Sequence, residues 1–105
     1  DGFAWTDQSV TFAAAAQNGY FCTGVLSVNL PASPTQGNTI IIYVDSASVV
    51  TIQANIGQTI QIGSSQSSVA GTAASTAEGS TVTLVYRAAD LEWHSISQEG
   101  TWTLA

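Results

Sequence analysis

The chain has 105 residues, enough for one domain with one core, and 45% of them are hydrophobic. Only 8% are charged, Arg87 is the single Lys or Arg, and the net charge is −6. Because phosphate groups are neutralised by clusters of Lys and Arg, this composition excludes nucleic acid and anionic membrane surfaces as partners. No apolar run approaches the roughly 20 residues that a membrane span needs, so membrane insertion is excluded as well.

The polar surface must come from Ser, Thr, Gln and Asn instead of charged residues. Abundant Val, Ile and Thr, together with three each of Trp, Tyr and Phe, argue against disorder. Such a polar surface with few charges is typical of extracellular adhesins, fibres and shells, and we expect an extracellular location. The chain begins at Asp1 without Met, which suggests a processed product or an excised domain.

The first third of the chain predicts short strands. No segment of 12 or more residues has a helical period, and the alanine-rich residues 12–17 predict at most one helical turn before the turn signal Asn18-Gly19. Residues 26–30 alternate between apolar and polar, which predicts a half-buried strand. Residues 31–38 contain both prolines and predict a fixed connection, because proline cannot donate to a strand ladder.

The middle of the chain continues this pattern. Residues 39–44 are nearly all β-branched or aromatic and predict a strand buried on both faces. Residues 50–54 and 59–62, separated by a tight turn, predict the clearest hairpin. Residues 63–79 are rich in Ser, Ala, Gly and Thr, and a loop of that length is unusual in a small domain. We therefore expect a short strand around Val69, or an extended stretch packed on another subunit.

The last third predicts a hairpin and a closing strand. Residues 81–86 place alternate apolar side chains on one face, and residues 87–92 connect them to a strand over 93–96. Residues 101–104 form the last expected strand, after a Glu-Gly turn.

These elements predict an all-β fold. About eight short strands at a spacing of roughly 8–12 residues indicate a single-domain β-sandwich or jelly-roll-like fold that spans residues 1–105. Residues 1–18 are expected to be an N-terminal extension or an interface segment.

Candidate catalytic groups are few. His94 is the only histidine, and with no second His or thiol cluster nearby it is interpreted as a solvated or packed strand residue. Asp90 and Glu92 have the residue types of a glycosidase pair or of a calcium site, but a polar hairpin has the same spacing, and Arg87 is expected to pair weakly with one of them. Cys22 has no disulfide partner and is expected to be buried. We predict no catalytic, cofactor or metal site, and no enzyme.

The aromatic residues are more informative. Tyr86 and Trp93 are expected in the core. Trp5 and Trp102 lie near the two termini, where the core of one domain offers least cover. An exposed tryptophan marks an oligomer interface or a platform for sugar rings, and we favour the interface.

An ordered set of motifs runs from Gly19 onward. It starts with a strand at Tyr20, and its later members are residues 28–40 (VNLPASPTQGNTI), 55–60 (NIGQTI), 82–86 (VTLVY) and Trp93. This order resembles a β-module of bacteriophage tail-fibre and other virion-appendage proteins, and it covers about 85 residues. Two departures are Asn38, where the module has an acid, and residues 87–92, which replace an Asp-Gly turn.

The resemblance implies a structural protein of the virion surface that assembles as a homotrimer. We expect a tail fibre, spike or capsid decoration involved in host attachment or particle stabilisation. Its partners would be its own copies, other virion proteins and a host cell-surface glycan, with multivalency multiplying weak contacts. The alternative is a carbohydrate-binding module or lectin-like domain.

Overall fold

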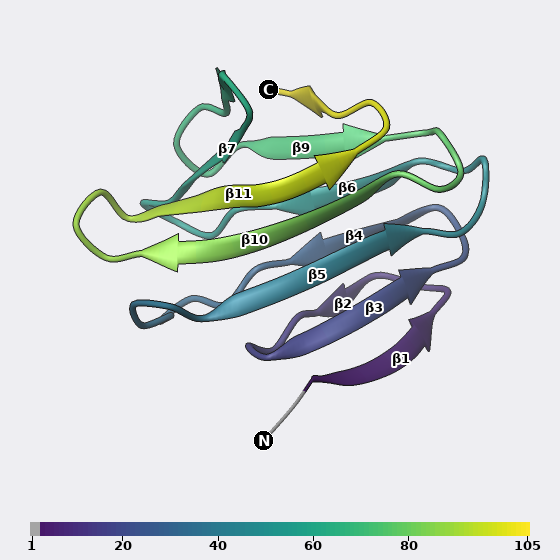
Figure 1. Ribbon diagram of the computed structural model, residues 1–105, viewed down its shortest axis with the longest axis horizontal. Coiled ribbons are helices and arrows are strands. Elements are labelled where there is room, and N and C mark those ends of the chain that lie inside the picture. Colours follow the sequence, from purple (N-terminus) through teal and green to yellow (C-terminus); the bar gives the residue numbers. More distant parts are fainter. Residues whose placement is uncertain (1–2) are drawn as a thin grey trace.

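The computed structural model describes residues 3–105, which form twelve β-strands and no helix (Figure 1). No helix long and apolar enough to cross a membrane exists in that range. The strands are β1 (Ala4–Gln8), β2 (Phe12–Ala13), β3 (Asn18–Cys22), β4 (Leu26–Asn29), β5 (Thr39–Val44), β6 (Val50–Gln53), β7 (Thr59–Ile62), β8 (Ser65–Gln66), β9 (Thr72–Ser75), β10 (Thr81–Arg87), β11 (Glu92–Glu99) and β12 (Thr103–Leu104).

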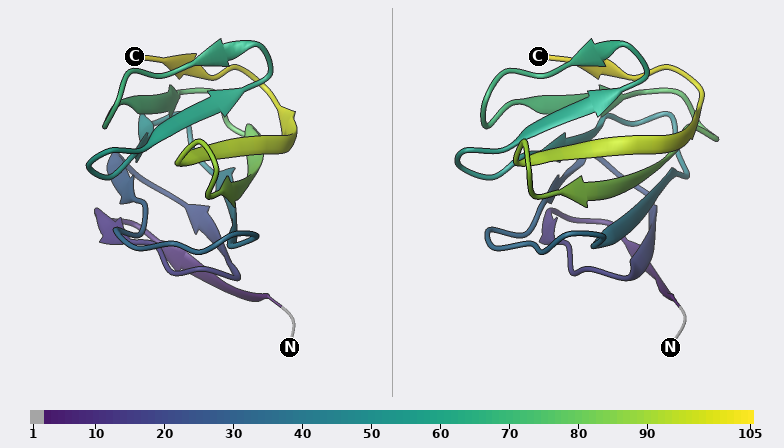
Figure 2. Two further views of the ribbon diagram at one scale, coloured as in Figure 1. Left: turned by 90° about the vertical axis from the view of Figure 1, so that its left-hand side faces the viewer. Right: turned by 60° about the vertical axis from the view of Figure 1, so that its left-hand side comes forward.

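The strands form two mixed sheets. The large sheet has the order β1-β3-β5-β10-β11-β7-β8, and the small sheet has the order β12-β9-β6-β4-β2. Figure 2 shows the chain passing back and forth between these two layers. The expected all-β domain is therefore confirmed, with more strands than predicted, because β1, β2 and β8 lie where the sequence predicted no strand.

The first six strands wind as a coil. Odd-numbered strands join the large sheet and even-numbered strands the small one, and from β3 onward each pairs in parallel with the strand two positions earlier. This winding is that of a short β-solenoid. Antiparallel strands β9 and β12 then complete the small sheet. The large sheet continues through β10 and β11, which are antiparallel, to β7, which is parallel to β11, and ends at β8. The strand order does not show jelly-roll connectivity, because a jelly roll is built from antiparallel neighbours.

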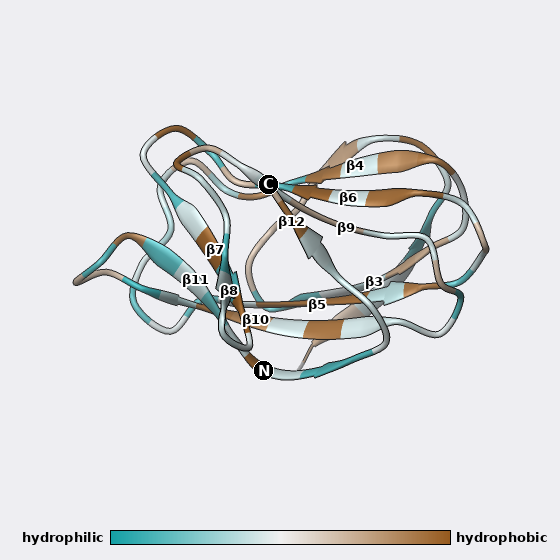
Figure 3. Cartoon of the chain, turned by 90° about the horizontal axis from the view of Figure 1, so that it is seen from above, coloured by the Kyte–Doolittle hydropathy of each residue, from teal (hydrophilic) through white to brown (hydrophobic). Residues whose placement is uncertain are grey.

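One hydrophobic core lies between the sheets. Alternate residues of β4, β5, β6 and β10 point inward and are buried, as their alternating sequences predict. Figure 3 shows this alternation as brown and pale segments along β4 and β6. Each fully buried Leu, Ile or Val contributes about 1.5–3 kcal/mol relative to an exposed one. The largest fully buried side chains are Trp93, Leu30, Ile40, Ile42, Ile52, Ile60 and Leu84.

The predicted hairpin over residues 50–62 is wrong. β6 belongs to the small sheet and β7 to the large sheet, so the turn between them passes from one sheet to the other instead of joining neighbours, and its Ile56 side chain is 90% exposed. The turn itself is tight: Gly57 has a φ of +81°, and the Gln58 N–H donates to Asn55 O at 3.0 Å. The buried Gln58 side chain then donates from Nε2 to Pro31 O at 2.9 Å, which holds the crossing in place.

Two smaller expectations also need correction. No strand forms at Val69, which is 65% exposed; the segment instead forms β8 and β9 on either side of it. Asn18 and Gly19 do not make a turn but open β3, and the reversal lies just before them, where Gln17 has a φ of +64°. Residues 12–17 accordingly hold β2 and this turn instead of a helical turn.

Candidate functional site

The outer face of the large sheet carries a row of aromatic side chains. Trp5 on β1, Phe21 on β3 and Tyr43 on β5 come from three neighbouring strands. The Trp5 and Phe21 ring centroids are 4.9 Å apart, and those of Phe21 and Tyr43 are 5.5 Å apart. Trp5 is 44% exposed and the other two are partly exposed. We call these three residues the aromatic row.

A glycine positions the first member of this row. Trp5 lies opposite Gly19 in the parallel pairing of β1 with β3. A Cβ atom at Gly19 would come within 2.5 Å of the indole ring, so the ring lies directly over the β3 backbone. Gly19 is thus required here for close approach and not for an unusual backbone angle.

β-Branched residues extend the row across the sheet. Ile41 of β5 lies beside Thr83 of β10, and Val85 of β10 lies on the same partly exposed face. Ile96 of β11 is 68% exposed. The expectation that β5 is buried on both faces is therefore wrong, because no other part of residues 3–105 covers its outer side chains.

The outer face of the small sheet is chemically different. Its partly exposed positions alternate with the core residues of β4, β6 and β9. They are small, polar and uncharged, apart from one alanine: Ser27, Asn29, Thr51, Gln53, Thr72 and Ala74. Only the large sheet therefore presents aromatic and branched apolar side chains to solvent.

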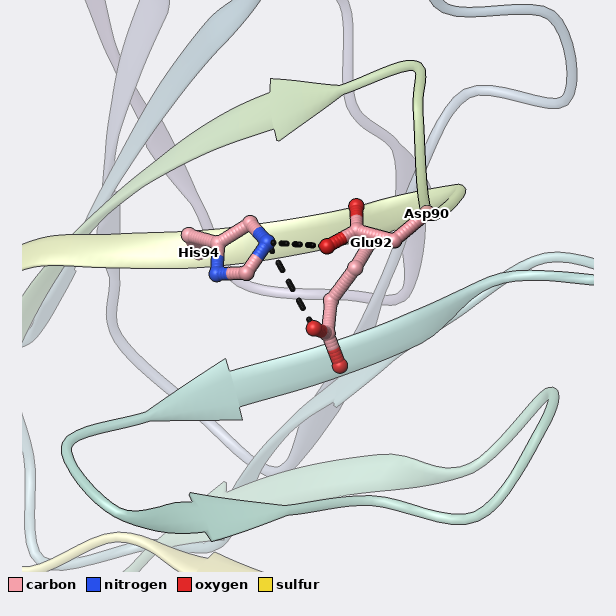
Figure 4. A group of neighbouring side chains, drawn as sticks. All are labelled: Asp90, Glu92 and His94. Atoms are coloured by element: carbon pink, nitrogen blue, oxygen red, sulfur yellow. Dashed lines mark hydrogen bonds and ion pairs between the residues drawn. The ribbon is translucent and has the colours of Figure 1, made fainter.

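A second group of side chains lies where β10 turns into β11. His94 Nε2 is 3.0 Å from Asp90 Oδ2 and 3.4 Å from Glu92 Oε1. One ligand atom from each of the three residues falls within 4.8 Å of the other two. Figure 4 shows the imidazole pointing toward both carboxylates. We call these residues the Asp90–Glu92–His94 cluster.

The local structure explains this convergence. Glu92 and His94 are two residues apart in β11 and so share a face, whereas Asp90 reaches them from a turn in which Leu91 has a φ of +54°. Desolvation acts to raise the pKa of Asp90, but the hydrogen bond and charge of His94, together with the charge of Arg87, hold that pKa below its ordinary value. The Arg87–Asp90 pair, at 3.4 Å, is exposed and of little energetic weight.

Glu92 is the unusual member of the cluster. It is only 3% exposed, although it is ionisable. Its Oε2 accepts hydrogen bonds from Thr59 Oγ1 at 2.7 Å and from Gln66 Nε2. These two hydrogen-bond donors, Thr59 on β7 and Gln66 on β8, carry no positive charge.

The two tryptophans singled out in the sequence are not brought together. Trp5 lies on the edge strand β1 of the large sheet, whereas Trp102 precedes β12 and packs partly buried against the core. Trp102 Nε1 donates to Thr81 O at 3.1 Å and to Glu99 O at 3.2 Å, which ties it to the backbone. Trp93 is buried in the core as expected.

Sequence reasoning missed most of the aromatic row, and it weighed Asp90, Glu92 and His94 without predicting that the three side chains converge. Phe21 precedes the inward-pointing Cys22, and Tyr43 precedes the inward-pointing Val44. Strict alternation could therefore have predicted that both aromatic rings point outward. Residues 3–105 enclose no pocket, at Asp90 and Glu92 or elsewhere. Neither a protein-family model nor a curated protein matches the chain.

Proposed function

We propose that the protein is a structural, non-enzymatic component of a phage-type virion surface, in which it assembles as a homotrimer. It would form part of a tail fibre, spike or capsid decoration and serve host attachment or particle stabilisation. The resemblance of its motif order to virion-appendage modules points to the virion. The outer face of the large sheet, with its aromatic row, is the observation that points to self-association.

The outer face of the large sheet exposes apolar side chains and has little charge at its centre. Exposed apolar area carries a free-energy cost of about 25 cal/mol per Å², and contiguous apolar patches are rare on monomers. The centre of the patch, at Ile41 and Tyr43, carries no charged side chain, whereas Asp7 lies opposite Phe21 and His94 opposite Val85 at its margins. Interface centres are depleted of charge and enriched in aromatic residues in the same way. A second and a third copy of the chain are the occupants that we propose.

A pair of matched substitutions tests this assignment. Ile41→Arg places a charge at the centre of the large-sheet face, and Thr51→Arg does the same on the small-sheet face. Both positions are partly exposed on interior strands. Light scattering after size exclusion at micromolar concentration should give a trimer for the wild type and Thr51→Arg, and a folded monomer for Ile41→Arg.

Two results would overturn the proposal. A monomeric wild-type protein at micromolar concentration would remove the trimer itself. Dissociation by Thr51→Arg but not by Ile41→Arg would move the interface to the small sheet. Circular dichroism of all three proteins shows whether loss of assembly reflects loss of folding.

A carbohydrate-binding module is the second candidate, favoured by one observation. Trp5 is 44% exposed, and Asp7 follows two residues later on the same face of β1, so an aromatic platform lies beside an acceptor of sugar hydroxyls. Titration with host glycans should then give saturable binding that Trp5→Ala abolishes and Trp102→Phe retains. Saturable binding by a monomer would favour this candidate over the trimeric assembly.

A further inference from the structure

We infer that the Asp90–Glu92–His94 cluster is a binding site for one divalent transition-metal ion of the zinc type. The ligand atoms would be Asp90 Oδ2, Glu92 Oε1 and His94 Nε2. All three side chains belong to one chain, so the site does not depend on the assembly proposed above. It would lie at the turn end of the β10–β11 hairpin, on the same side of the molecule as the outer face of the large sheet.

The spacing of the ligand atoms matches such an ion. Zinc binds imidazole nitrogen and carboxylate oxygen at about 2.0–2.2 Å, and neighbouring ligands in a tetrahedral site are then roughly 3.3–3.6 Å apart. His94 Nε2 lies 3.0 Å from Asp90 Oδ2 and 3.4 Å from Glu92 Oε1. The third separation is no more than 4.8 Å, and Asp90, on the exposed turn, can move to close it.

The burial of Glu92 is an independent observation that points to a cation. A carboxylate taken out of water is costly unless a positive charge compensates it. Two neutral donors hold Glu92 Oε2, and Arg87, the only Arg in the chain, pairs with Asp90 instead. Among the residues that the structure describes, the partner of Glu92 Oε1 is His94 Nε2, 3.4 Å away. A bound ion would replace the imidazole proton between these atoms and supply the charge that the buried carboxylate lacks.

The surroundings already have the form of a metal site. Residues that bind metals are usually oriented by hydrogen bonds from an outer layer of side chains. Thr59 and Gln66 do this for Glu92, because both bond to Oε2 and leave Oε1 directed at the cluster. Gln66 belongs to the two-residue strand β8, which this contact ties to β11.

The donor set selects the class of ion. Ca²⁺ and Mg²⁺ take oxygen ligands, whereas an imidazole nitrogen suits Zn²⁺, Co²⁺ and Ni²⁺. With one nitrogen and two oxygens from the protein, a tetrahedral ion keeps one position for water or another small ligand. Zn²⁺ should therefore bind and Ca²⁺ should not.

Isothermal titration of the untagged protein, stripped with a chelator, tests the site directly. Zn²⁺ should bind with one ion per chain, and Co²⁺ should give visible absorption bands that Zn²⁺ displaces. His94→Gln and Glu92→Gln should each weaken Zn²⁺ binding at least about tenfold, as loss of a ligand predicts. The matched control is Glu99→Gln, an acid on the same strand but at its far end, which should leave binding unchanged.

Asp90→Asn keeps the experiment decisive if Glu92→Gln perturbs folding. Asp90 is exposed on the turn, so its replacement leaves the core intact while removing one ligand. Absence of Zn²⁺ binding by the folded wild type would overturn the inference. Equal binding by Asp90→Asn, His94→Gln and Glu99→Gln, or tighter binding of Ca²⁺ than of Zn²⁺, would overturn it as well.

Discussion

Cys22 lies on β3 with no exposed surface, and its burial raises the pKa of its thiol to about 12. Because only the thiolate reacts with disulfide reagents, the folded protein should not be labelled at pH 8. Labelling with a chromogenic disulfide should be complete within minutes in denaturant and at least about a hundredfold slower without it. Rapid labelling of the native protein would show that β3 opens readily at the β1 edge of the sheet.

The same shift gives stability a pH dependence of known sign. The unfolded thiol ionises near 9.0, whereas the folded thiol stays protonated up to a pKa of about 12. Between these values the unfolded state binds fewer protons, so the free energy of unfolding falls as pH rises, by up to about 1.4 kcal/mol per pH unit.

Urea unfolding of the wild type and of Cys22→Ala at several pH values between 9 and 11 measures this effect. The two proteins differ at this one position, so the difference between their profiles isolates the thiol. The unfolding free energy of Cys22→Ala should fall less steeply with pH than that of the wild type. Parallel profiles would mean that the folded thiol ionises as easily as the unfolded one.

Gly19 makes a residue-scale prediction about how β1 is held. Gly19→Ala should displace the Trp5 indole from Phe21, since a Cβ there would lie 2.5 Å from the ring. We expect a loss of about 1–3 kcal/mol of unfolding free energy, the usual cost of overpacking. A double-mutant cycle supplies the control: in a Trp5→Ala background, Gly19→Ala should cost much less. Equal costs in the two backgrounds would show that the ring does not rest on Gly19.

At the scale of elements, the crossing between β6 and β7 depends on one amide. Gln58 Oε1 accepts from Trp93 Nε1 at 3.0 Å, and Gln58 Nε2 donates to Pro31 O. Gln58→Ala would leave Trp93 Nε1 unpaired in the interior and Pro31 O unpaired at a part-buried position, and a buried group left unpaired costs about 1–3 kcal/mol. Urea unfolding should show this loss, whereas Gln61→Ala, at a partly exposed position of β7, should change stability by less than about 0.5 kcal/mol. A Gln58→Ala protein as stable as Gln61→Ala would contradict this account of the crossing.

The same crossing shows where sequence reasoning reached its limit. The alternation in Leu26–Asn29 and Thr81–Arg87 is a local property with a period of two, and it predicted both strands. Which sheet a strand joins depends on partners far along the chain. Residues 55–58 have the composition of a hairpin turn, yet they link the two sheets, and the buried Gln58 side chain anchors this link to Pro31 O. No local pattern distinguishes these two outcomes.

The candidate sites also contain some residues that local alternation can place and others that it cannot. Trp5 was predicted as an interface residue because it is a tryptophan near a chain terminus. The outward position of its neighbour Phe21 could have been predicted from strand alternation. Glu92 and His94 also share a face by alternation. Asp90 joins them only because Leu91, which is not a glycine, takes a positive φ of 54°, and its residue type gives no sign of this.

At the scale of the whole molecule, the charge distribution predicts how assembly responds to salt. Each copy carries a net charge of −6, so three copies repel one another at long range. The proposed interface around Ile41 and Tyr43 contains no ion pair that salt could screen. Raising the salt concentration from about 0.05 M to 0.5 M shortens the screening length from about 14 Å to 4 Å and weakens only the repulsion.

Sedimentation velocity at the two salt concentrations should therefore show a trimer that is equally stable or more stable at high salt. Arg87→Ala serves as the control, because it removes the only Arg or Lys and should leave association unchanged. Dissociation on adding salt, or on losing Arg87, would require ion pairs between copies. Since the chain has so few positive charges to form them, that result would place the interface at the β10–β11 turn, where Arg87 and His94 lie, instead of on the aromatic row.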